Sequence, residues 1–283
     1  MIRSFGIAAL MALLLAAPAS AQLITDLVAF PVVARGPGLH GTQWVSDLTL
    51  FNPMDHGMNV FVGFLPANQN NGGSQYLTVY FLDSGETMMV EDVLQTAFGI
   101  DGDDKGMLTL NVNPDLTQNP EGSVVEGVTR TYNTGAGEGT YGQTVPGLMP
   151  AFNVGWASSF ITGARNDDSY RSNLGIASAS ITKVIRVYFE ITSSDGTVLA
   201  EGFKDIHIQS MNQWSFDQLG IGAEEGPLTV ELWLDADDAS QDPCAGLFPN
   251  GFFAYVSKVD NLTGDAEFIY AYPMAPYLCP EDE

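Results

Sequence analysis

Apolar and polar residues alternate along most of this chain. Every second residue is apolar in LTLNVN, residues 108–113, in LTVELWL, residues 228–234, and in KVIRVYFEIT, residues 183–192. A period of two between clusters of Gly, Pro, Asn and Asp is typical of half-buried antiparallel strands. Helical periodicity is limited to EDVLQTAFG, residues 91–99, which ends in a glycine. The pattern predicts an all-β chain with only short helical turns.

Several of these segments occur twice, in the same order. The similar pairs are WVSDLTLFNP (44–53) with YRSNLGIASA (170–179), FGIDGDDKGMLTL (98–110) with LGIGAEEGPLTV (219–230), and VTRTYN (128–133) with VSKVDN (256–261). Recurrence of one strand-and-turn unit is the mark of a repeated architecture. Each copy has the length and turn spacing of a β-sandwich. The sequence therefore predicts two tandem antiparallel β-sandwich domains related by internal duplication, over residues 22–150 and 151–283.

The N-terminus has the features of a secretory signal peptide. Arg3 precedes an apolar run from Phe5 to Ala17, and the small-residue site Ala19-Ser20-Ala21 follows. These features predict a signal peptide over residues 1–21, with cleavage between Ala21 and Gln22. The apolar run is too short to cross a bilayer of about 30 Å. We therefore expect a secreted or periplasmic protein whose mature chain does not insert into a membrane.

The charge balance narrows the classes of partner. Lys and Arg total 10 against 34 Asp and Glu, which gives a formal net charge of −24. A chain this acidic is repelled by nucleic acid and by anionic membrane surfaces. Because charged residues are only 16% and hydrophobic residues 45%, the acidity belongs to a globular chain and not to a disordered one.

The two cysteines, Cys244 and Cys279, predict one disulfide, because an even pair in an exported chain is normally oxidised. Cys244 lies where the second copy is longer than the first, and Cys279 lies in the C-terminal tail. The bond would therefore join the tail to a loop that only the second copy has. A two-thiol metal site is the alternative, but His207, the nearest histidine, has no metal-ligand spacing to either cysteine.

These segments together resemble a known kind of protein. The quoted stretches, with GTYGQTVPG, ITGARNDDSYRSNLGIAS and FAYVSKVDNLTGDAEFIYA, are similar to those of secreted bacterial proteins built of tandem β-sandwich, immunoglobulin-like units. The resemblance covers nearly the whole mature chain. It implies the fold and export, and it implies no catalytic residue, since these proteins have no assigned activity.

The stretch GEGTYG, residues 137–142, matches the glycine spacing of dinucleotide-binding loops. Such a loop needs a helix after it, because the pyrophosphate binds at the helix N-terminus. The Gly and Pro residues of TYGQTVPGLMP cannot sustain a helix. The stretch is better interpreted as a hairpin turn between two strands near the end of the first unit.

Other motifs of catalysis are weak. SITK, residues 180–183, matches S-x-x-K but lacks its companion motifs, and it is interpreted as a turn before a strand. His40, His56 and His207 occur in no context typical of a catalytic triad, although a triad can assemble from distant positions. We predict no catalytic residue.

Clusters of acidic residues leave calcium as the one candidate cofactor. They occur at residues 101–106, 165–169 and 235–242, and the best candidate ligands are Asp235, Asp237, Asp238 and Asp242. Calcium takes six to eight oxygen ligands, which clustered aspartates and loop carbonyls can supply. Solvated turns, where Asp is common, are the alternative.

We therefore expect an exported, non-enzymatic structural or interaction module that binds a protein or glycan partner at the cell surface or in the periplasm. One alternative is a carbohydrate-binding module, with or without calcium, and another is a hydrolase assembled from scattered residues. Aromatic residues such as Trp233 could stack on sugars. Because Trp233 alternates with Leu232 and Leu234, we expect it to face a second core or the interface between the two units instead.

Overall fold

The structure, a computed structural model, describes residues 25–73, 76–135, 140–148, 158–235 and 251–273. Over these residues the chain is built of antiparallel strands with only short helices, which confirms the all-β class. The predicted signal peptide, the predicted boundary between residues 150 and 151, and both cysteines lie outside the described residues. Within them, no helix is both long and apolar enough to cross a membrane.

The N-terminal half, residues 25–148, forms two layers that share strand β1. Sheet 1A has the strand order β4-β3-β6-β1, and sheet 1B has the order β5-β2-β7-β8. Strand β1 pairs with β6 over most of its length and with β2 only at its end, where Gly36 faces Trp44. The strands are β1 (Leu27–Pro37), β2 (Gln43–Phe51), β3 (Met58–Pro66), β4 (Tyr76–Leu82), β5 (Thr87–Val90), β6 (Asp104–Asn111), β7 (Glu126–Asn133) and β8 (Tyr141–Pro146).

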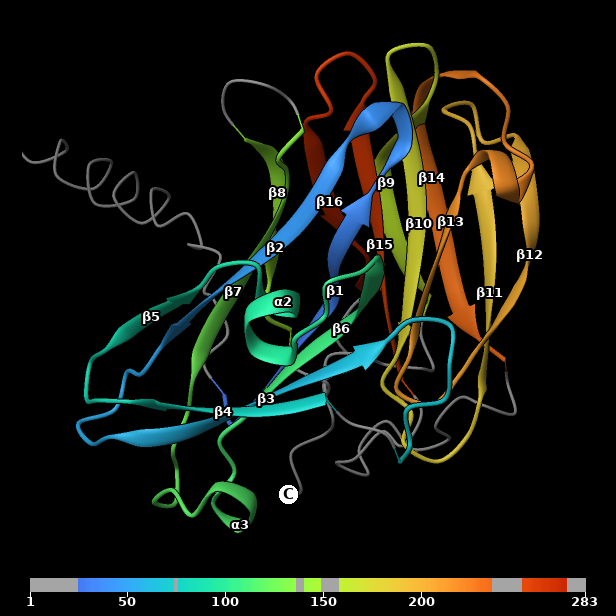
Figure 1. Ribbon diagram of the computed structural model, residues 1–283. Coiled ribbons are helices and arrows are strands. Elements are labelled where there is room, and N and C mark those ends of the chain that lie inside the picture. Colours follow the sequence, from blue (N-terminus) through green and yellow to red (C-terminus); the bar gives the residue numbers. More distant parts are fainter. Residues whose placement is uncertain (1–24, 74–75, 136–139, 149–157, 236–250, 274–283) are drawn as a thin grey trace, which may run out of the picture.

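The C-terminal half, residues 158–273, repeats this strand order. Sheet 2A runs β12-β11-β14-β9-β17 and sheet 2B runs β13-β10-β15-β16, so β1 to β8 match β9 to β16 strand for strand. Figure 1 shows the first half in blue to green and the second in yellow to red. The strands are β9 (Ser159–Asn166), β10 (Tyr170–Ser178), β11 (Ile185–Thr192), β12 (Val198–Ile206), β13 (Met211–Ser215), β14 (Glu224–Leu234), β15 (Phe252–Asp260), β16 (Ala266–Tyr270) and β17 (Tyr272–Pro273).

Short helical elements interrupt the strands at corresponding places. Helix α2 (Val93–Phe98) follows β5, and the 3-10 turn η3 (Asp217–Leu219) follows β13. Helix α2 is the short helix predicted from EDVLQTAFG, and it ends at Gly99, whose positive φ of 68° suits glycine. The remaining elements are the 3-10 turn η1 (Leu39–Gly41) and helix α3 (Pro114–Thr117).

The segment GEGTYG belongs to the hairpin of β7 and β8, as predicted. The two strands pair antiparallel from Asn133↔Tyr141 to Val128↔Pro146. Residues 136–139, within the loop, lie outside the described part. A side chain at Gly142 would place its Cβ 2.4 Å from the carbonyl oxygen of Thr131. At Gly142, therefore, close approach of the two strands accounts for the glycine without any ligand.

Two apolar cores fill the structure, and the first extends across both halves. The second core lies between sheets 2A and 2B. The first lies between 1A and 1B, and it also includes four buried residues of sheet 2B, namely Ala177, Met211, Phe253 and Tyr255. The two sandwiches are thus joined by a continuous apolar contact, through the face of sheet 2B that points away from its own core.

Candidate functional site

The outer face of sheet 2B changes character along its strands. Where Ala177 faces Met211 on one side and Phe253 on the other, the face is apolar and buried in the first core. Four residues before Ala177 on β10, Asn173 faces Ser257 on β15. Two residues before Asn173, Arg171 faces Val259. Successive side chains of a strand alternate between its faces, so all of these residues point toward the N-terminal sandwich. The contact between the sandwiches is therefore apolar at one end and polar at the other.

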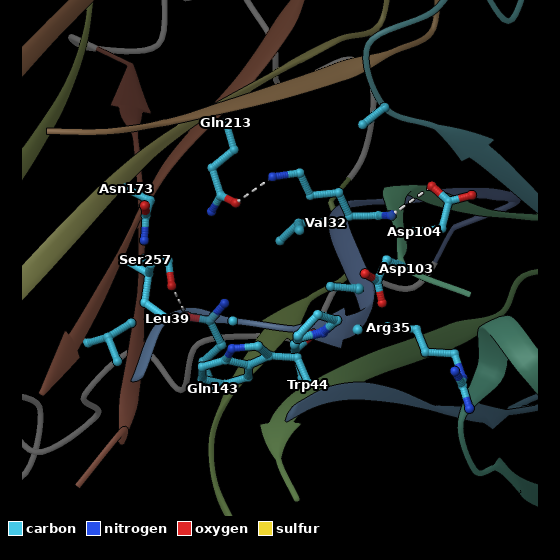
Figure 2. Close-up of a pocket in the computed structure, with 18 of the residues that line it drawn as sticks. Val32, Arg35, Leu39, Trp44, Asp103, Asp104, Gln143, Asn173, Gln213 and Ser257 are labelled. Atoms are coloured by element: carbon cyan, nitrogen blue, oxygen red, sulfur yellow. Dashed lines mark hydrogen bonds between the residues drawn. The ribbon is translucent and has the colours of Figure 1, made fainter. Parts of the chain in front are cut away.

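The polar end is a cleft of about 510 Å³. Sheet 2B forms one wall with Arg171, Asn173, Gln213, Ser257 and Val259, and the N-terminal sandwich forms the other (Figure 2). The residues of that second wall include Val32 and Arg35 from β1, Trp44 from β2, Lys105 from β6, Thr131 from β7, Gln143 from β8, and Asn68. A volume of this size lies within the usual range of small-molecule sites.

Hydrogen bonds across the junction fix the two walls relative to one another. Ser257 Oγ donates to Gln143 Oε1 at 2.9 Å, and Lys105 Nζ donates to Gln213 Oε1 at 3.3 Å, as the dashed lines of Figure 2 show. Beyond the cleft, the buried amide of Asn71 donates to the carbonyl oxygen of Gln209 at 2.8 Å. Together with the shared core, these bonds hold the cleft open as part of one packed structure.

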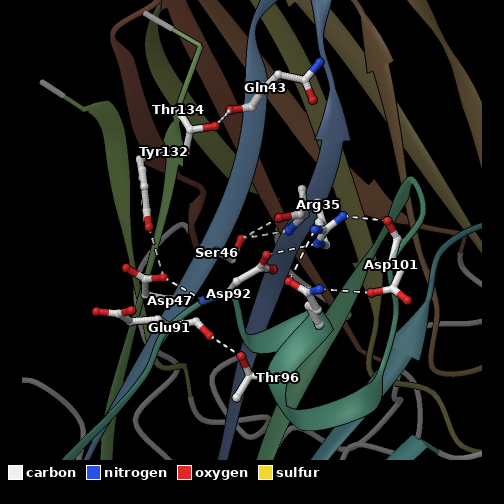
Figure 3. A network of polar contacts seen from close by, with 12 residues as sticks. Arg35, Gln43, Ser46, Asp47, Glu91, Asp92, Thr96, Asp101, Tyr132 and Thr134 are labelled. Carbon is white, nitrogen blue, oxygen red and sulfur yellow. Dashed lines mark hydrogen bonds and ion pairs between the residues drawn. The ribbon is translucent and has the colours of Figure 1, made fainter. Parts of the chain in front are cut away.

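A polar network lies behind the wall formed by β1 and β2 (Figure 3). Arg35 Nε donates to Asp92 Oδ2 at 3.0 Å, and its Nη1 donates to the carbonyl oxygen of Asp101 at 2.7 Å. Asp47 accepts the backbone N–H of Asp92 and the hydroxyl of Tyr132. Burial, followed by the nearby Asp47 carboxylate, raises the pKa of Tyr132. These bonds tie α2 to β1 and sheet 1B, and they occupy the guanidinium of Arg35.

Two amide side chains that line the cleft, the half-buried Asn173 and the solvent-exposed Asn68, have no protein partner. In the described part of the chain, neither the Asn68 nor the Asn173 side chain makes a hydrogen bond, and the polar atoms of both are open to solvent. Gln143 and Gln213 use their oxygens within the junction, which leaves their NH₂ groups for a ligand. An amide can both donate and accept, so this set suits a ligand rich in hydroxyl groups.

Two cations of the cleft are not neutralised. Among the described residues, no carboxylate lies within 4.0 Å of Lys105 or Arg171. Burial lowers the pKa of Lys105. Burial also lowers the pKa of Arg171, with a partial offset from Asp260, and its Nη1 donates to Asn261 Oδ1 at 2.9 Å.

Two carboxylates line the same cleft. Asp104 Oδ1 accepts the backbone N–H of Lys105 at 2.8 Å, and burial raises the pKa of this carboxyl group despite that bond. The Asp103 carboxylate lies over the backbone of Gly36, where φ is +134° and an added Cβ would lie 2.5 Å from Asp103 Oδ1. The cleft therefore carries both signs of charge, in a chain whose net charge is −24.

A second hollow of about 380 Å³ adjoins the first at Arg171, which lines both. It lies between the end of the β7–β8 hairpin, with Gly135 and Tyr141, and the turn between β15 and β16, residues 261–264. The segment that resembled a nucleotide loop therefore borders a cavity. No phosphate-binding helix follows it, because the chain continues directly into β8.

The predicted calcium ligands are largely outside the described residues. Asp237, Asp238 and Asp242 lie there, as do Cys244 and Cys279. Asp235 is described, and its Oδ2 accepts the hydroxyl of Tyr188 at 3.1 Å. Within the described ranges, no three His, Cys, Asp or Glu side chains are grouped so as to hold a metal. The calcium and disulfide predictions thus stay predictions.

One serine, histidine and aspartate are linked in the order of a catalytic triad. His56 Nε2 lies 3.2 Å from Ser123 Oγ, and its Nδ1 lies 3.2 Å from Asp55 Oδ1. However, Ser123 is 1% exposed and its hydroxyl donates to the carbonyl oxygen of Pro120 at 2.7 Å. A nucleophile needs access to substrate and a hydroxyl proton directed at its base. This arrangement has neither feature.

The SITK segment is a bend that precedes β11 at Ile185, in line with its interpretation as a turn. Ser180 Oγ donates to the carbonyl oxygen of Lys183 at 2.9 Å and accepts the N–H of Lys183 at 3.3 Å. The serine hydroxyl thus bonds to the backbone of its own turn.

The prediction for Trp233 was wrong. Its ring belongs to neither core, and it stacks on Tyr188 on the outer face of sheet 2A, at 5.8 Å between ring centroids and 10° between planes. Phe203 continues the row on β12, with the Arg186 guanidinium 4.1 Å from its ring centroid. Because Tyr188 and Trp233 are stacked on one another, they do not offer two free faces to one sugar.

Of the cleft's polar residues, sequence analysis singled out only Asp103 and Asp104, within the acidic cluster at residues 101–106, and none of the amides or cations as ligand-binding groups. The amides and cations come from strands and loops of both sandwiches, and each residue alone resembles an ordinary surface position. The available clue was β15, where FFAYV, residues 252–256, is apolar at every position. Such a run indicates a strand buried on both faces, and hence a second layer packed against sheet 2B.

Comparisons with known proteins add little. No family model matches the sequence, and no curated protein matches it. Among solved structures, a protein of Parabacteroides distasonis described as secreted is similar over 89% of this chain and 92% of its own, with 8% identity and a TM-score of 0.20. A TM-score this low does not establish a common fold, so nothing about fold or function follows from it.

Proposed function

We propose that the chain is an exported, non-enzymatic binding protein that takes a short hydroxyl-rich glycan in the cleft between its two sandwiches. The observation that carries this proposal is the convergence of amide side chains from both sandwiches on one cavity. Asn68 and Gln143 come from the N-terminal side, and Asn173 and Gln213 come from sheet 2B. Glycan binding at the cell surface or in the periplasm accounts for this lining, which a purely structural spacer would not need.

The lining favours a glycan over an apolar ligand. Vacant donors and acceptors in a partly buried cleft lose free energy when an apolar ligand displaces their water, whereas sugar hydroxyls can replace that water. On the wall formed by the N-terminal sandwich, Trp44 supplies the surface of an aromatic ring. Its Nε1 donates a hydrogen bond to Thr42 Oγ1 at 3.0 Å. Amides around one aromatic ring suit a sugar, which has polar edges and apolar faces.

Binding to a panel of immobilised oligosaccharides, followed by calorimetry on each ligand found, tests the proposal. Asn173→Ala and Asn68→Ala are expected to weaken binding about tenfold each, since each removes a hydrogen-bonding group. Thr229→Ala is the matched control, because Thr229 lies on β14 in sheet 2A, outside the cleft. Binding that is unchanged in both asparagine variants, or absent from the whole panel, would overturn the proposal.

A protein partner is the second candidate, and one surface favours it. Strand β4 is an edge strand, and Leu77, Val79 and Phe81 are 52%, 47% and 58% exposed on its outer face. The matching strand β12 carries Glu201 and Asp205 around Phe203. Charged residues protect an edge from added strands, and β4 has none there. Val79→Lys is expected to abolish capture of a partner that adds a strand to β4, and to leave glycan binding intact.

The remaining predictions from the sequence belong to the same proposal. The matching order of β1–β8 and β9–β16 supports an origin by internal duplication, and the export signal and single disulfide fit a protein of the cell exterior. Intact mass measurement of the exported protein, before and after reduction, tests cleavage before Gln22 and the Cys244–Cys279 bond together. Repeating the glycan calorimetry with calcium and with a chelator tests the metal site at Asp235–Asp242.

A further inference from the structure

Among the described residues, most cations have a carboxylate or an aromatic ring as partner, and two that have neither line one cavity. Arg35, Arg165, Arg186 and Lys258 are each paired with a carboxylate, at 2.7–3.0 Å. Arg130 and Lys204 lie over aromatic rings. Lys105 and Arg171 have neither a carboxylate within 4.0 Å nor a ring beneath the charge among the described residues. Both line the cleft between the sandwiches.

Leaving Lys105 without a carboxylate, and Arg171 with only a partial offset from Asp260, is unfavourable, because a half-buried cation loses part of its hydration. Lys105 has three N–H donors, and the structure gives it one neutral acceptor, Gln213 Oε1, at 3.3 Å. Arg171 donates to Asn261 Oδ1, which is also neutral. Burial lowers the pKa of both side chains. An anion in the cleft would recover the lost solvation of both cations.

We propose that the cleft recognises a sugar acid, a hydroxyl-rich ring bearing one carboxylate, with the positive charges of Lys105 and Arg171 on its walls attracting the carboxylate and the amides binding the hydroxyls. This inference rests on the proposed glycan-binding function and specifies its ligand class. Charge-assisted hydrogen bonds to a carboxylate are about twice as strong as neutral ones. The carboxylate would therefore contribute much of the affinity, and the hydroxyl contacts much of the orientation.

The other charges of the cleft favour a single negative charge. Asp103 and Asp104 line it as well, and the whole chain carries a net charge of −24. A phosphate ester approaches two negative charges, so it would meet more repulsion from these aspartates than a carboxylate does. A sulfate ester carries one charge, but its oxygens are less basic than those of a carboxylate and accept weaker charge-assisted hydrogen bonds from the two cations. Carboxylated sugars are therefore preferred over phosphorylated or sulfated ones.

Calorimetry with matched ligands tests the ligand class. The probes are the trimer of galacturonic acid, its methyl ester, which removes the charge and keeps the hydroxyls, and the neutral galactose trimer. We expect the acid to bind at least about tenfold more tightly than the ester. We also expect its affinity to fall with added NaCl, while that of the ester does not. A sulfated galactose trimer should bind more weakly than the acid.

Variants of the cations identify the residues. Lys105→Met and Arg171→Met should each reduce the preference for acid over ester, with little effect on the ester itself. Arg130→Met removes the same charge outside the cleft and should leave the preference unchanged. Thermal unfolding of each variant checks folding, and Lys105→Met should fold at least as stably as the natural chain, since it removes a half-buried charge.

The outcomes separate this inference from the proposed function. If the neutral trimer and the ester bind as tightly as the acid, or the sulfated trimer binds more tightly, the carboxylate inference is wrong and glycan binding stands. If no trimer binds, the sugar-acid inference is wrong, and the proposed glycan binding is wrong as well only if the whole oligosaccharide panel also fails to bind. Monomeric galacturonate binding as tightly as the trimer indicates a free sugar acid as the ligand, whereas affinity that rises with length indicates a residue within an acidic polysaccharide. Either of these supports the inference.

Discussion

The ring of Tyr255 lies across the backbone of its cross-strand partner, Gly175, so closely that a Cβ at Gly175 would lie 2.1 Å from Tyr255 Cζ. The pair stands on the outer face of sheet 2B, between the apolar row of Ala177 and the polar row of Asn173. It therefore marks the border between the core shared by the sandwiches and the cleft. Whatever disturbs this pair should disturb the junction that forms the cleft.

Gly175→Ala should destabilise the protein by about 1–3 kcal/mol, the usual effect of overpacking a filled core. The ring has little room to move, because Tyr255 is fully buried and stacks on Phe268 at 5.0 Å between centroids. Urea denaturation measures the change. Gly102→Ala is the control, since nothing lies within 4 Å of the added methyl group there. Equal stability of the two variants would show that the junction is loosely packed.

Tyr255→Phe should leave the protein as stable as before, or more stable by about 1 kcal/mol, because the buried hydroxyl has no hydrogen-bond partner in the described structure. Burial alone raises the pKa of this phenol. Tyr132→Phe is the matched comparison, since the Tyr132 hydroxyl donates to Asp47 Oδ1 at 3.2 Å. Its loss should cost about 0.5–1.5 kcal/mol. A larger loss for Tyr255→Phe than for Tyr132→Phe would contradict this account of the junction.

The protein should lose stability as the pH falls from about 4 toward 2. Hydrogen bonds from Ser193 and from the N–H of Thr197 lower the pKa of Asp195, in the β11–β12 turn, from 3.8 to about 2. A carboxyl group whose folded pKa lies below its unfolded value stabilises the fold above the unfolded value, and this contribution disappears as pH falls through the folded one. Urea denaturation across this range measures the slope. Asp195→Ala should make the dependence of unfolding free energy on pH shallower. An unchanged slope would show that Asp195 does not contribute to the loss of stability at low pH.

Glu190→Gln should stabilise the protein by about 0.2–1 kcal/mol. On sheet 2A, Glu190 faces Glu201 on β12 and Glu231 on β14, so three carboxylates stand side by side across adjacent strands. Like charges in directly opposed positions repel one another, and salt screens that repulsion. The melting temperature of Glu190→Gln should therefore exceed that of the natural chain at low NaCl, and the difference should shrink at high NaCl. Glu121→Gln, at a turn outside the strands, should show no such gain.

Local pattern predicted the strands well, because the period of two that marks a strand needs no knowledge of its neighbours. LTLNVN and LTVELWL became parts of β6 and β14, and GEGTYG became part of a hairpin. The cleft could not be predicted in this way. It exists because the outer face of sheet 2B contacts the other sandwich. The alternating side chains of β10 indicate only that the strand has two different faces, and not what the outer face contacts. For the same reason Trp233 was assigned to a buried face, although that face of sheet 2A joins neither core.

The central claim, that ligand binds between the sandwiches, is tested most directly by NMR of the isotope-labelled mature protein titrated with the galacturonic acid trimer. We expect the shifts of backbone and side-chain amide signals to concentrate at Asn68, Asn173 and Gln213, which line the cleft. Shifts concentrated instead at Phe81 of the β4 edge or at Trp233 of sheet 2A, or no shifts at all, would contradict the account.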